Sequence, residues 1–182
     1  DLLVDDQGLV PWGLEAPTHG AMGRFGNVML VNGEAGWQTE ARPGEVVRLF
    51  LTNVSNTRTF NLGFGPGARM KLVGSDLGNY AREQWVESVV IAPAERYIVD
   101  VRFEKAGEVA MVNRVRAIDH LFARFFDVVD TLGMVGVRGA AAAPDLGAAF
   151  TSLRHDAVAD AEMAALVRAH QGLPPQHTLE LR

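Results

Sequence analysis

The chain has 182 residues, 48% of them hydrophobic, and a formal net charge of −5. This length suits one well-packed domain with appendages, and the acidic balance argues against nucleic acid as a partner. The chain contains no cysteine, which excludes disulfides, thiolate nucleophiles and iron–sulfur clusters, and also blue copper, since that centre needs a thiolate beside two histidines. No apolar run approaches the roughly 18 residues that a membrane span needs.

The first 24 residues are rich in glycine, proline and acidic residues, and they predict an irregular lead-in. From there to residue 138, short β-branched and aromatic runs alternate with turn residues at intervals of about 8–12 residues, the spacing of β-sandwiches. The predicted strands cover residues 28–31, 37–41, 46–52, 57–64, 69–75, 85–91, 96–103, 108–115 and 131–137. The run 46–52 alternates best, with Val47, Leu49 and Leu51 on one face. Nine short strands without an intervening helix predict two packed antiparallel sheets.

The last part of the chain predicts a linker with one helix over residues 139–176. A glycine, four alanines and Pro144 open the linker. Asp156 is expected to be the N-cap or a first-turn acid, and Gly172 and the pair Pro174-Pro175 end the helix. Apolar residues repeat at helical spacing at Val158, Met163, Leu166 and Val167. A strand pattern resumes at 177–182 without a successor, so we expect the native polypeptide to continue into another domain.

Five segments, in this order and spacing, resemble the second cupredoxin-like domain of three-domain multicopper oxidases, the family of laccases, bilirubin oxidase and bacterial copper oxidases. They are residues 26–33, 43–53, 55–62, 74–78 and 89–97. The resemblance covers roughly residues 27–137. It implies an all-β fold, a cupredoxin-like Greek-key antiparallel β-sandwich at residues 25–138 with a short C-terminal helix. Residues 1–24 then link to a preceding domain, and residues 177–182 begin the third domain.

The resemblance also indicates where copper ligands are missing. In cupredoxins the metal loop joins the last two strands, and here Val112-Asn113-Arg114 stands where a Cys-His pair is expected. A long insert, residues 116–130, follows before the surviving ending around Met134. Met134 is either a relic axial ligand or, as we interpret it, a core methionine. The histidines form no His-x-His pair; they are His19, His120, His155, His170 and His177. No catalytic and no metal-binding residue is therefore assigned, and the resemblance places copper in the flanking domains of the parent.

Two groups of residues are candidate contact sites. A polar cluster at a strand-to-strand loop would face the substrate pocket by resemblance to laccases, or it would serve turn chemistry by bonding its own backbone; it comprises Asn53, Ser55, Asn56 and Arg58. Aromatic and basic residues of the insert are expected to contact a neighbouring domain; they are Arg116, His120, Phe122, Phe125 and Phe126. His120 beside Asp119 is either a base or metal ligand or an ordinary loop histidine.

These observations predict the copper-free middle domain of a multicopper oxidase. It would give structural and interface support to substrate oxidation and oxygen reduction in flanking cupredoxin domains, its partners within one polypeptide. The alternative is a cupredoxin-like binding or protein-interaction module with no redox role. Self-association into a homo-oligomer is a third possibility. The resemblance implies a periplasmic or extracellular location.

Overall fold

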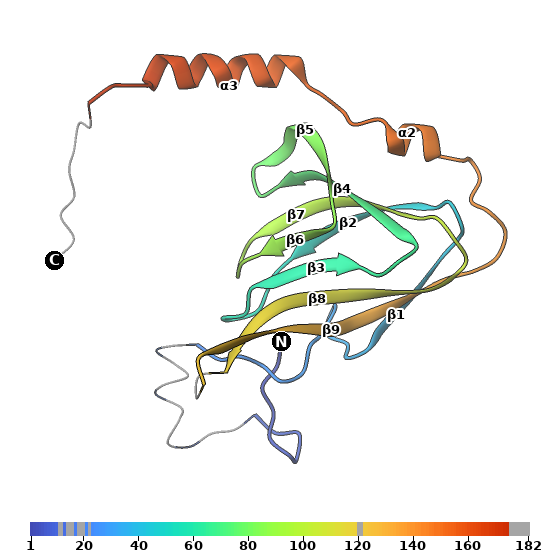
Figure 1. Ribbon diagram of the computed structural model, residues 1–182, viewed down its shortest axis with the longest axis vertical. Coiled ribbons are helices and arrows are strands. Elements are labelled where there is room, and N and C mark those ends of the chain that lie inside the picture. The colour runs from blue at the N-terminus through green and yellow to red at the C-terminus, as the bar shows by residue number, and fades with distance from the viewer. Residues whose placement is uncertain (11–12, 14–16, 18–20, 22, 120–121, 175–182) are drawn as a thin grey trace.

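The computed structural model describes residues 1–10, 13, 17, 21, 23–119 and 122–174, and its centre is a sandwich of two β-sheets (Figure 1). A five-stranded sheet has the order β1-β9-β8-β3-β6, and a four-stranded sheet has the order β2-β7-β4-β5. The strands are β1 (Trp37–Ala41), β2 (Val46–Thr52), β3 (Phe60–Phe64), β4 (Ala68–Ser75), β5 (Gly78–Val86), β6 (Ser88–Ile91), β7 (Arg96–Phe103), β8 (Gly107–Asp119) and β9 (Arg124–Val137). The predicted two-sheet sandwich is confirmed.

The hydrophobic core lies between the facing sheets, because strand residues alternate between the two faces of each sheet. Val99 and Val101 of β7 are completely buried, and Phe103 of the same strand packs edge-on against Phe64 of β3 with ring centroids 5.9 Å apart. The predicted alternation of 46–52 is confirmed, since Val47, Leu49 and Leu51 pack against the core. Each fully buried side chain of this kind stabilises the fold by roughly 1.5–3 kcal/mol.

Two predicted strands differ from those observed. Residues 28–31 form only isolated bridges, from Val28 to Leu2 and from Val31 to Glu34, because the tight turn at Asn32-Gly33 is followed by no second strand. The turn itself has the positive φ values expected of this pair, 53° and 86°. The predicted strand 85–91 is divided at Glu87 into β5 and β6, which belong to different sheets. Sheet orientation also differs at one place, since β1 pairs with β9 in parallel.

The insert at residues 116–130, predicted as a loop, is a β-hairpin. Strand β8 extends to Asp119 and β9 begins at Arg124, with Arg116 paired to Asp127 and Ala117 to Phe126. The physical reason is the run of Phe and Val on the returning side, which favours extended backbone. The hairpin extends beyond the body of the sandwich (Figure 1).

Two helices follow the sandwich where one was predicted: α2 (Gly147–Thr151) and α3 (Ala157–His170). Asp156 caps α3 as predicted, its carboxylate accepting from the backbone N–H groups of Val158 and Ala159. No residue of α3 is buried, and the helix projects away from the sheets (Figure 1). The apolar stripe of α3 is therefore exposed. No helix in the described part of the chain is long and apolar enough to cross a membrane.

Candidate functional site

The outer part of the β8–β9 hairpin, residues 114–129 without the undescribed positions 120 and 121, is the largest concentration of exposed aromatic side chains that we find in the described chain; we call it the hairpin surface. Phe122, Phe125 and Phe126 are 68%, 60% and 50% exposed. Val129, on the same strand as Phe125, is exposed as well. Exposed apolar side chains gathered in one segment mark interaction sites.

The hairpin surface has two apolar faces. Residues paired directly across an antiparallel ladder lie on one face, so the register places Arg116 with Asp127 on the same face as Phe125. The guanidinium carbon of Arg116 lies 5.1 Å from the centre of the Phe125 ring. Phe126 pairs with Ala117 and lies on the other face. A two-stranded ribbon without cover is marginal in water, so this geometry suits a surface that another domain covers on both sides.

Residues 53–58 form the second predicted site, and most of its polar groups bond within the loop. The Asn53 amide donates to the carbonyls of Arg58 at 2.7 Å and Ile91 at 2.9 Å. Its carbonyl oxygen accepts from the backbone N–H and the hydroxyl of Ser55, at 2.9 and 2.7 Å. Asn53 and Ser55 are both buried, while Asn56 is exposed. The turn chemistry weighed for this loop is therefore present, and its contact with a substrate stays a prediction.

Arg58 fastens this loop to the lead-in. Its Nε donates to the Asp1 carboxylate at 2.6 Å, its Nη2 donates to the Gly26 carbonyl at 2.7 Å, and its guanidinium lies 5.3 Å from the centre of the Phe25 ring. Asn56 also accepts from the backbone N–H of Arg24 at 3.0 Å. The loop and residues 23–26 therefore act as one structural unit.

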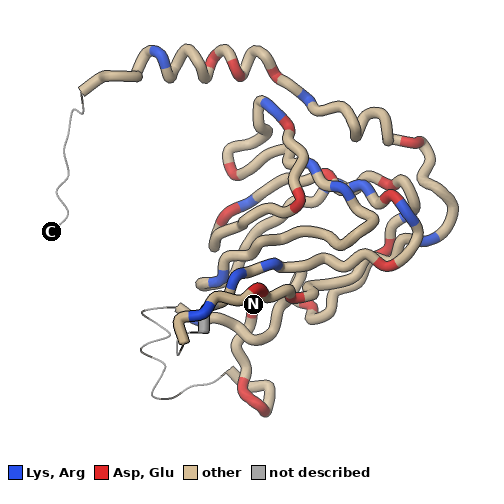
Figure 2. The backbone as a smooth tube through the Cα atoms, in the orientation of Figure 1, with Lys and Arg blue, Asp and Glu red and all other residues tan. Residues whose placement is uncertain are grey.

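A row of charges crosses the outer face of the four-stranded sheet, and we call it the charge ladder. It runs from Arg48 on β2 through Asp100 on β7, Lys71 on β4 and Glu83 on β5 to Arg154. Basic and acidic positions are interspersed along these strands (Figure 2). The closest contacts are Arg48 Nε to Asp100 Oδ1 at 2.7 Å and Lys71 Nζ to Glu83 Oε2 at 2.9 Å. The ladder was not predicted, although outward charges in four apolar strands were a usable signal.

The centre of the charge ladder, Asp100, Lys71 and Glu83, is buried, and residues 150–156 cover it, while Arg48 and Arg154 at the two ends are 49% and 38% exposed. The Lys71 and Glu83 side chains are only 6% and 5% exposed. Phe150 of α2 is buried, with Lys71 Nζ 5.6 Å from its ring centre and the Trp85 ring edge-on to it at 5.2 Å. The Glu83 carboxylate also accepts from the backbone N–H of Arg154 at 2.9 Å.

The Glu83 carboxyl is held in its charged form. Burial raises its pKa, but hydrogen bonds from the Arg154 backbone N–H and from Lys71 outweigh burial, so the pKa is lowered overall. A single bridge between Arg82 and His155 continues the contact along the edge strand β5. The segment after α2 is thus fixed to the sheet by backbone and charge together.

Comparison with known proteins gives this chain its family. The model of the multicopper oxidase family matches residues 14–127, which is more than half of the chain. The chain belongs to the multicopper oxidase family.

The relatives and solved structures agree with this assignment. A laccase of Bacillus subtilis (strain 168) is 38% identical over 78 residues, covering 43% of this chain and 15% of the laccase. Cell division protein FtsP of Aggregatibacter aphrophilus (strain NJ8700) is 30% identical over 140 residues, covering 70% of this chain and 29% of that protein. The solved multicopper oxidase of Pseudomonas thermotolerans has a TM-score of 0.57 at 26% identity and covers 79% of this chain and 31% of that one. The chain thus spans less than a third of each.

The cupredoxin-like, laccase-like character predicted from the sequence is confirmed by these matches. The McoA multicopper oxidase of Aquifex aeolicus, at 22% identity, shares the fold with a TM-score of 0.61 over 80% of this chain. Membership of the multicopper oxidase family implies copper in the parent protein. The greater length of the relatives fits partner domains within one polypeptide.

Asn113 lies in the segment Val112-Asn113-Arg114, where the resemblance leads us to expect a copper-ligand pair. Its side chain is completely buried; its oxygen accepts from the backbone N–H of Asn61 at 2.9 Å, and its nitrogen donates to Asp130 at 3.1 Å. The chain has no cysteine, and the described residues contain no group of three His, Cys, Asp or Glu that could hold a metal. The donor set therefore does not fit copper. His120, His177 and the rest of 177–182 lie outside the described residues.

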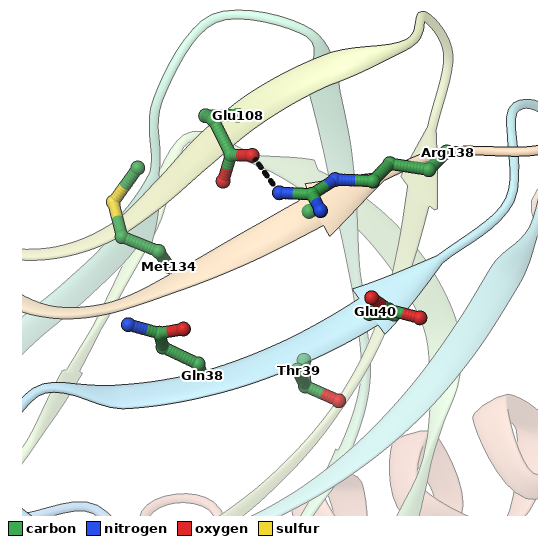
Figure 3. A pocket seen from close by; sticks show the side chains of 7 residues that line it. Gln38, Thr39, Glu40, Glu108, Met134 and Arg138 are labelled. Carbon is green, nitrogen blue, oxygen red and sulfur yellow. Dashed lines mark hydrogen bonds and ion pairs between the residues drawn. The ribbon is translucent and has the colours of Figure 1, made fainter.

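A pocket of about 330 Å³ lies on the outer face of β1, β9 and β8 (Figure 3). Arg138 donates to Glu108 at 2.6 Å, and this bond, together with the charges of Glu108 and Glu40, raises the pKa of Arg138. The Arg138 side chain is 66% exposed and the Glu108 side chain is 50% exposed, so this ion pair contributes little to stability. Met134 lines this pocket and lies outside the core, so the interpretation as a core methionine is wrong.

Proposed function

We propose that this chain is the copper-free middle domain of a multicopper oxidase, and that its task is to hold copper-bearing domains in place. The observation that carries the proposal is that the residue at the expected copper-ligand position, Asn113, makes structural hydrogen bonds. In a sandwich of this family, Asn113 at the expected ligand position is buried. Its side-chain amide accepts a hydrogen bond from the backbone N–H of Asn61 and donates one to Asp130. A chain without cysteine offers no thiolate for blue copper.

In the parent, electrons would be taken from the substrate one at a time and used in flanking domains to reduce oxygen to water. The role of this chain is to orient those domains. We assign the contact to the hairpin surface, through Arg116, Phe122, Phe125 and Phe126, together with His120. Two exposed apolar faces on one ribbon support this assignment, because each face can be covered by a different domain.

The loop at residues 53–58 is proposed to border the substrate pocket of the parent. Asn53 and Ser55 would set the shape of the loop through their internal bonds, and Arg58 would hold it against residues 23–26. Asn56 is the member whose side chain is exposed. Asn56 is therefore the residue through which a direct substrate contact is expected.

Metal analysis tests the proposal. The purified chain is incubated with cupric ion, passed through a desalting column, and assayed for bound copper and visible absorption. We expect no stoichiometric copper, no intense blue band and no oxidation of phenols or metal ions. One tightly held copper per chain with a blue charge-transfer band would overturn the proposal. A variant of Asp130 (Asp130→Asn), which keeps the shape beside Asn113, is the matched control for adventitious binding to that carboxylate.

The second candidate function is an interaction module with no redox role in any part of the protein. The observation that favours it is the presence of cell division protein FtsP among the relatives, one of which matches 70% of this chain. In that case the hairpin surface would contact a separate protein. Sequencing the gene on both sides discriminates the two. His-x-His pairs upstream and a His-Cys-His segment downstream are expected for the oxidase, and their absence favours the module. The oxidase would act in the periplasm or outside the cell.

A further inference from the structure

A second pocket, of about 690 Å³, opens where the chain crosses between the two sheets. One wall is the turn from β3 to β4, including Gly65 and Pro66, and the other is the crossing from β5 to β6 at Val86, Glu87 and Ser88. The volume lies within the range of roughly 300–1,000 Å³ that small-molecule sites occupy. Of the residues assigned to the domain contact, those that the structure describes, Arg116, Phe122, Phe125 and Phe126, are not among the residues that line this pocket.

The pocket has an apolar floor. Phe64 and Met70 line it, and both belong to the buried core. Val86 and Ala68, which pack against the core, line it as well. The recess therefore reaches the edge of the hydrophobic core, where it can remove the apolar body of a ligand from water.

The rim of the pocket is polar, with two arginines and one glutamate among its lining residues. Arg69 is already engaged, since its guanidinium carbon lies 4.4 Å from the centre of the Trp85 ring and Nη1 lies 3.8 Å from Glu104. Arg114 donates from Nη2 to the Phe64 carbonyl at 3.3 Å and forms no ion pair with a carboxylate within the described chain. Arg114 is therefore the rim cation with donors to spare.

Gly63 places the Arg114 guanidinium at this rim. A Cβ at position 63 would lie 2.6 Å from Nη1 of Arg114 and 2.7 Å from the Glu87 carbonyl oxygen, so a side chain there would displace the arginine and also clash with the backbone. The backbone of β3 thus leaves a seat for the guanidinium beside Ser88, which pairs with Gly63 across the sheet. Close approach explains Gly63 alone, since a Cβ at Gly65 or Gly67 would meet only ordinary contacts at 3.6 Å.

We propose that this pocket binds a small monocarboxylic acid with an apolar or aromatic body. The carboxylate pairs with Arg114, whose planar fork of N–H donors matches carboxylate geometry, and the body lies on Phe64, Met70 and Val86. Because Arg69 is engaged with Glu104 and Arg114 is the rim cation with donors to spare, a ligand with a single negative charge is favoured. A small ligand fits better than a protein segment because the floor is recessed to the core.

The test compares phenylacetate with 2-phenylethanol, a neutral compound of similar size, by titration of the 15N-labelled chain followed by NMR. We expect saturable shifts of residues 64–68 and 86–88 with phenylacetate, and at least tenfold weaker binding of the alcohol, since a charge-assisted hydrogen bond is lost. Arg114→Gln should weaken phenylacetate about tenfold and leave the alcohol unchanged. The matched control is Arg96→Gln, which removes a charge at the other end of the four-stranded sheet and should change neither affinity.

Three results would overturn the proposal. They are no saturable binding of phenylacetate at millimolar concentration, equal binding of acid and alcohol, and shifts located away from the pocket. Because the comparison of the two probes uses the unmodified chain, it decides the question even if a variant folds poorly. Copper analysis of the same chain is a separate readout, so failure here leaves the proposed domain-positioning role standing.

Discussion

The charge ladder and the hairpin surface differ in which side chains they bury and which they expose. On the four-stranded sheet, the charged side chains of Lys71, Glu83 and Asp100 are buried, and each has a partner of opposite charge. On the hairpin, residues that favour the core are exposed. The ladder is complete within this chain, because residues 150–156 supply its cover. On the hairpin, Phe125 and Phe126 are still 60% and 50% exposed in the described chain, so we expect another domain to cover them. Stability and interaction are thus assigned to different strands.

The largest expected effect comes from breaking the ladder at its centre. Lys71→Ala leaves Glu83 and Asp100 as buried carboxylates without their shared cation, which should lower the free energy of unfolding by about 3–5 kcal/mol. Urea denaturation followed by circular dichroism measures this. The control is Arg96→Ala, which removes an exposed pair with Asp76 and should cost about 0–1 kcal/mol. Equal losses in the two variants would mean that the ladder is no different from a surface ion pair.

A somewhat smaller effect is expected from removing the apolar part of the cover. Phe150→Ala deletes a buried ring that packs on Trp85, and the loss should be about 3 kcal/mol, at the lower end for such a change because the segment can detach. Limited proteolysis should then cut within residues 144–156 faster than in the unmodified chain. Leu153→Ala, at an exposed position of the same segment, is the control. Unchanged protection in Phe150→Ala would contradict the assigned role of residues 150–156.

Acid should weaken the ladder next. The pKa of Glu83 is lowered in the folded chain, so its stabilising contribution is full above the unfolded value near 4.5 and is lost as pH falls through the lower, folded value. Urea midpoints of the unmodified chain should therefore decrease below about pH 5. The Glu83→Gln variant should be less stable than the unmodified chain at neutral pH, and its urea midpoint should change less as the pH falls below about 5. Parallel pH curves for the two chains would remove Glu83 from the explanation.

Sequence reasoning reached the features that depend on neighbouring residues. The alternation of Val47, Leu49 and Leu51 and the Asp156 cap both follow from local rules, and both are confirmed. The ladder depends on register across strands: Arg48 and Asp100 lie 52 positions apart in the chain. Nothing local fixes that pairing. It therefore became visible only in the folded chain.

The candidate sites divide in the same way. Sequence reasoning located the exposed aromatic residues of the insert but predicted a loop where the structure has a β-hairpin. The short turn between β8 and β9 could not be distinguished from a loop. Sequence reasoning also located the loop at residues 53–58 and left two roles open for it, contact with a substrate pocket and hydrogen bonding to its own backbone. The buried amide of Asn53 could be assigned to the Arg58 and Ile91 carbonyls only from coordinates. The pocket beside Arg114 joins β3, β4, β5, β6 and β8 and has no signal along the chain.

The smallest effect on stability should come from the hairpin surface, and this is what separates it from the ladder. Phe125→Ser changes a side chain that is 60% exposed, so the free energy of unfolding of this chain should move by no more than about 0.5 kcal/mol. In the parent protein the same change should expose apolar surface and loosen the contact with a flanking domain, read as faster proteolysis between domains. Phe50→Ser, at an exposed position on the edge strand β2, is the matched control. If Phe125→Ser destabilised this chain by several kcal/mol, the hairpin would be part of the core assembly, and the division between a stabilising sheet and an interacting ribbon would fail.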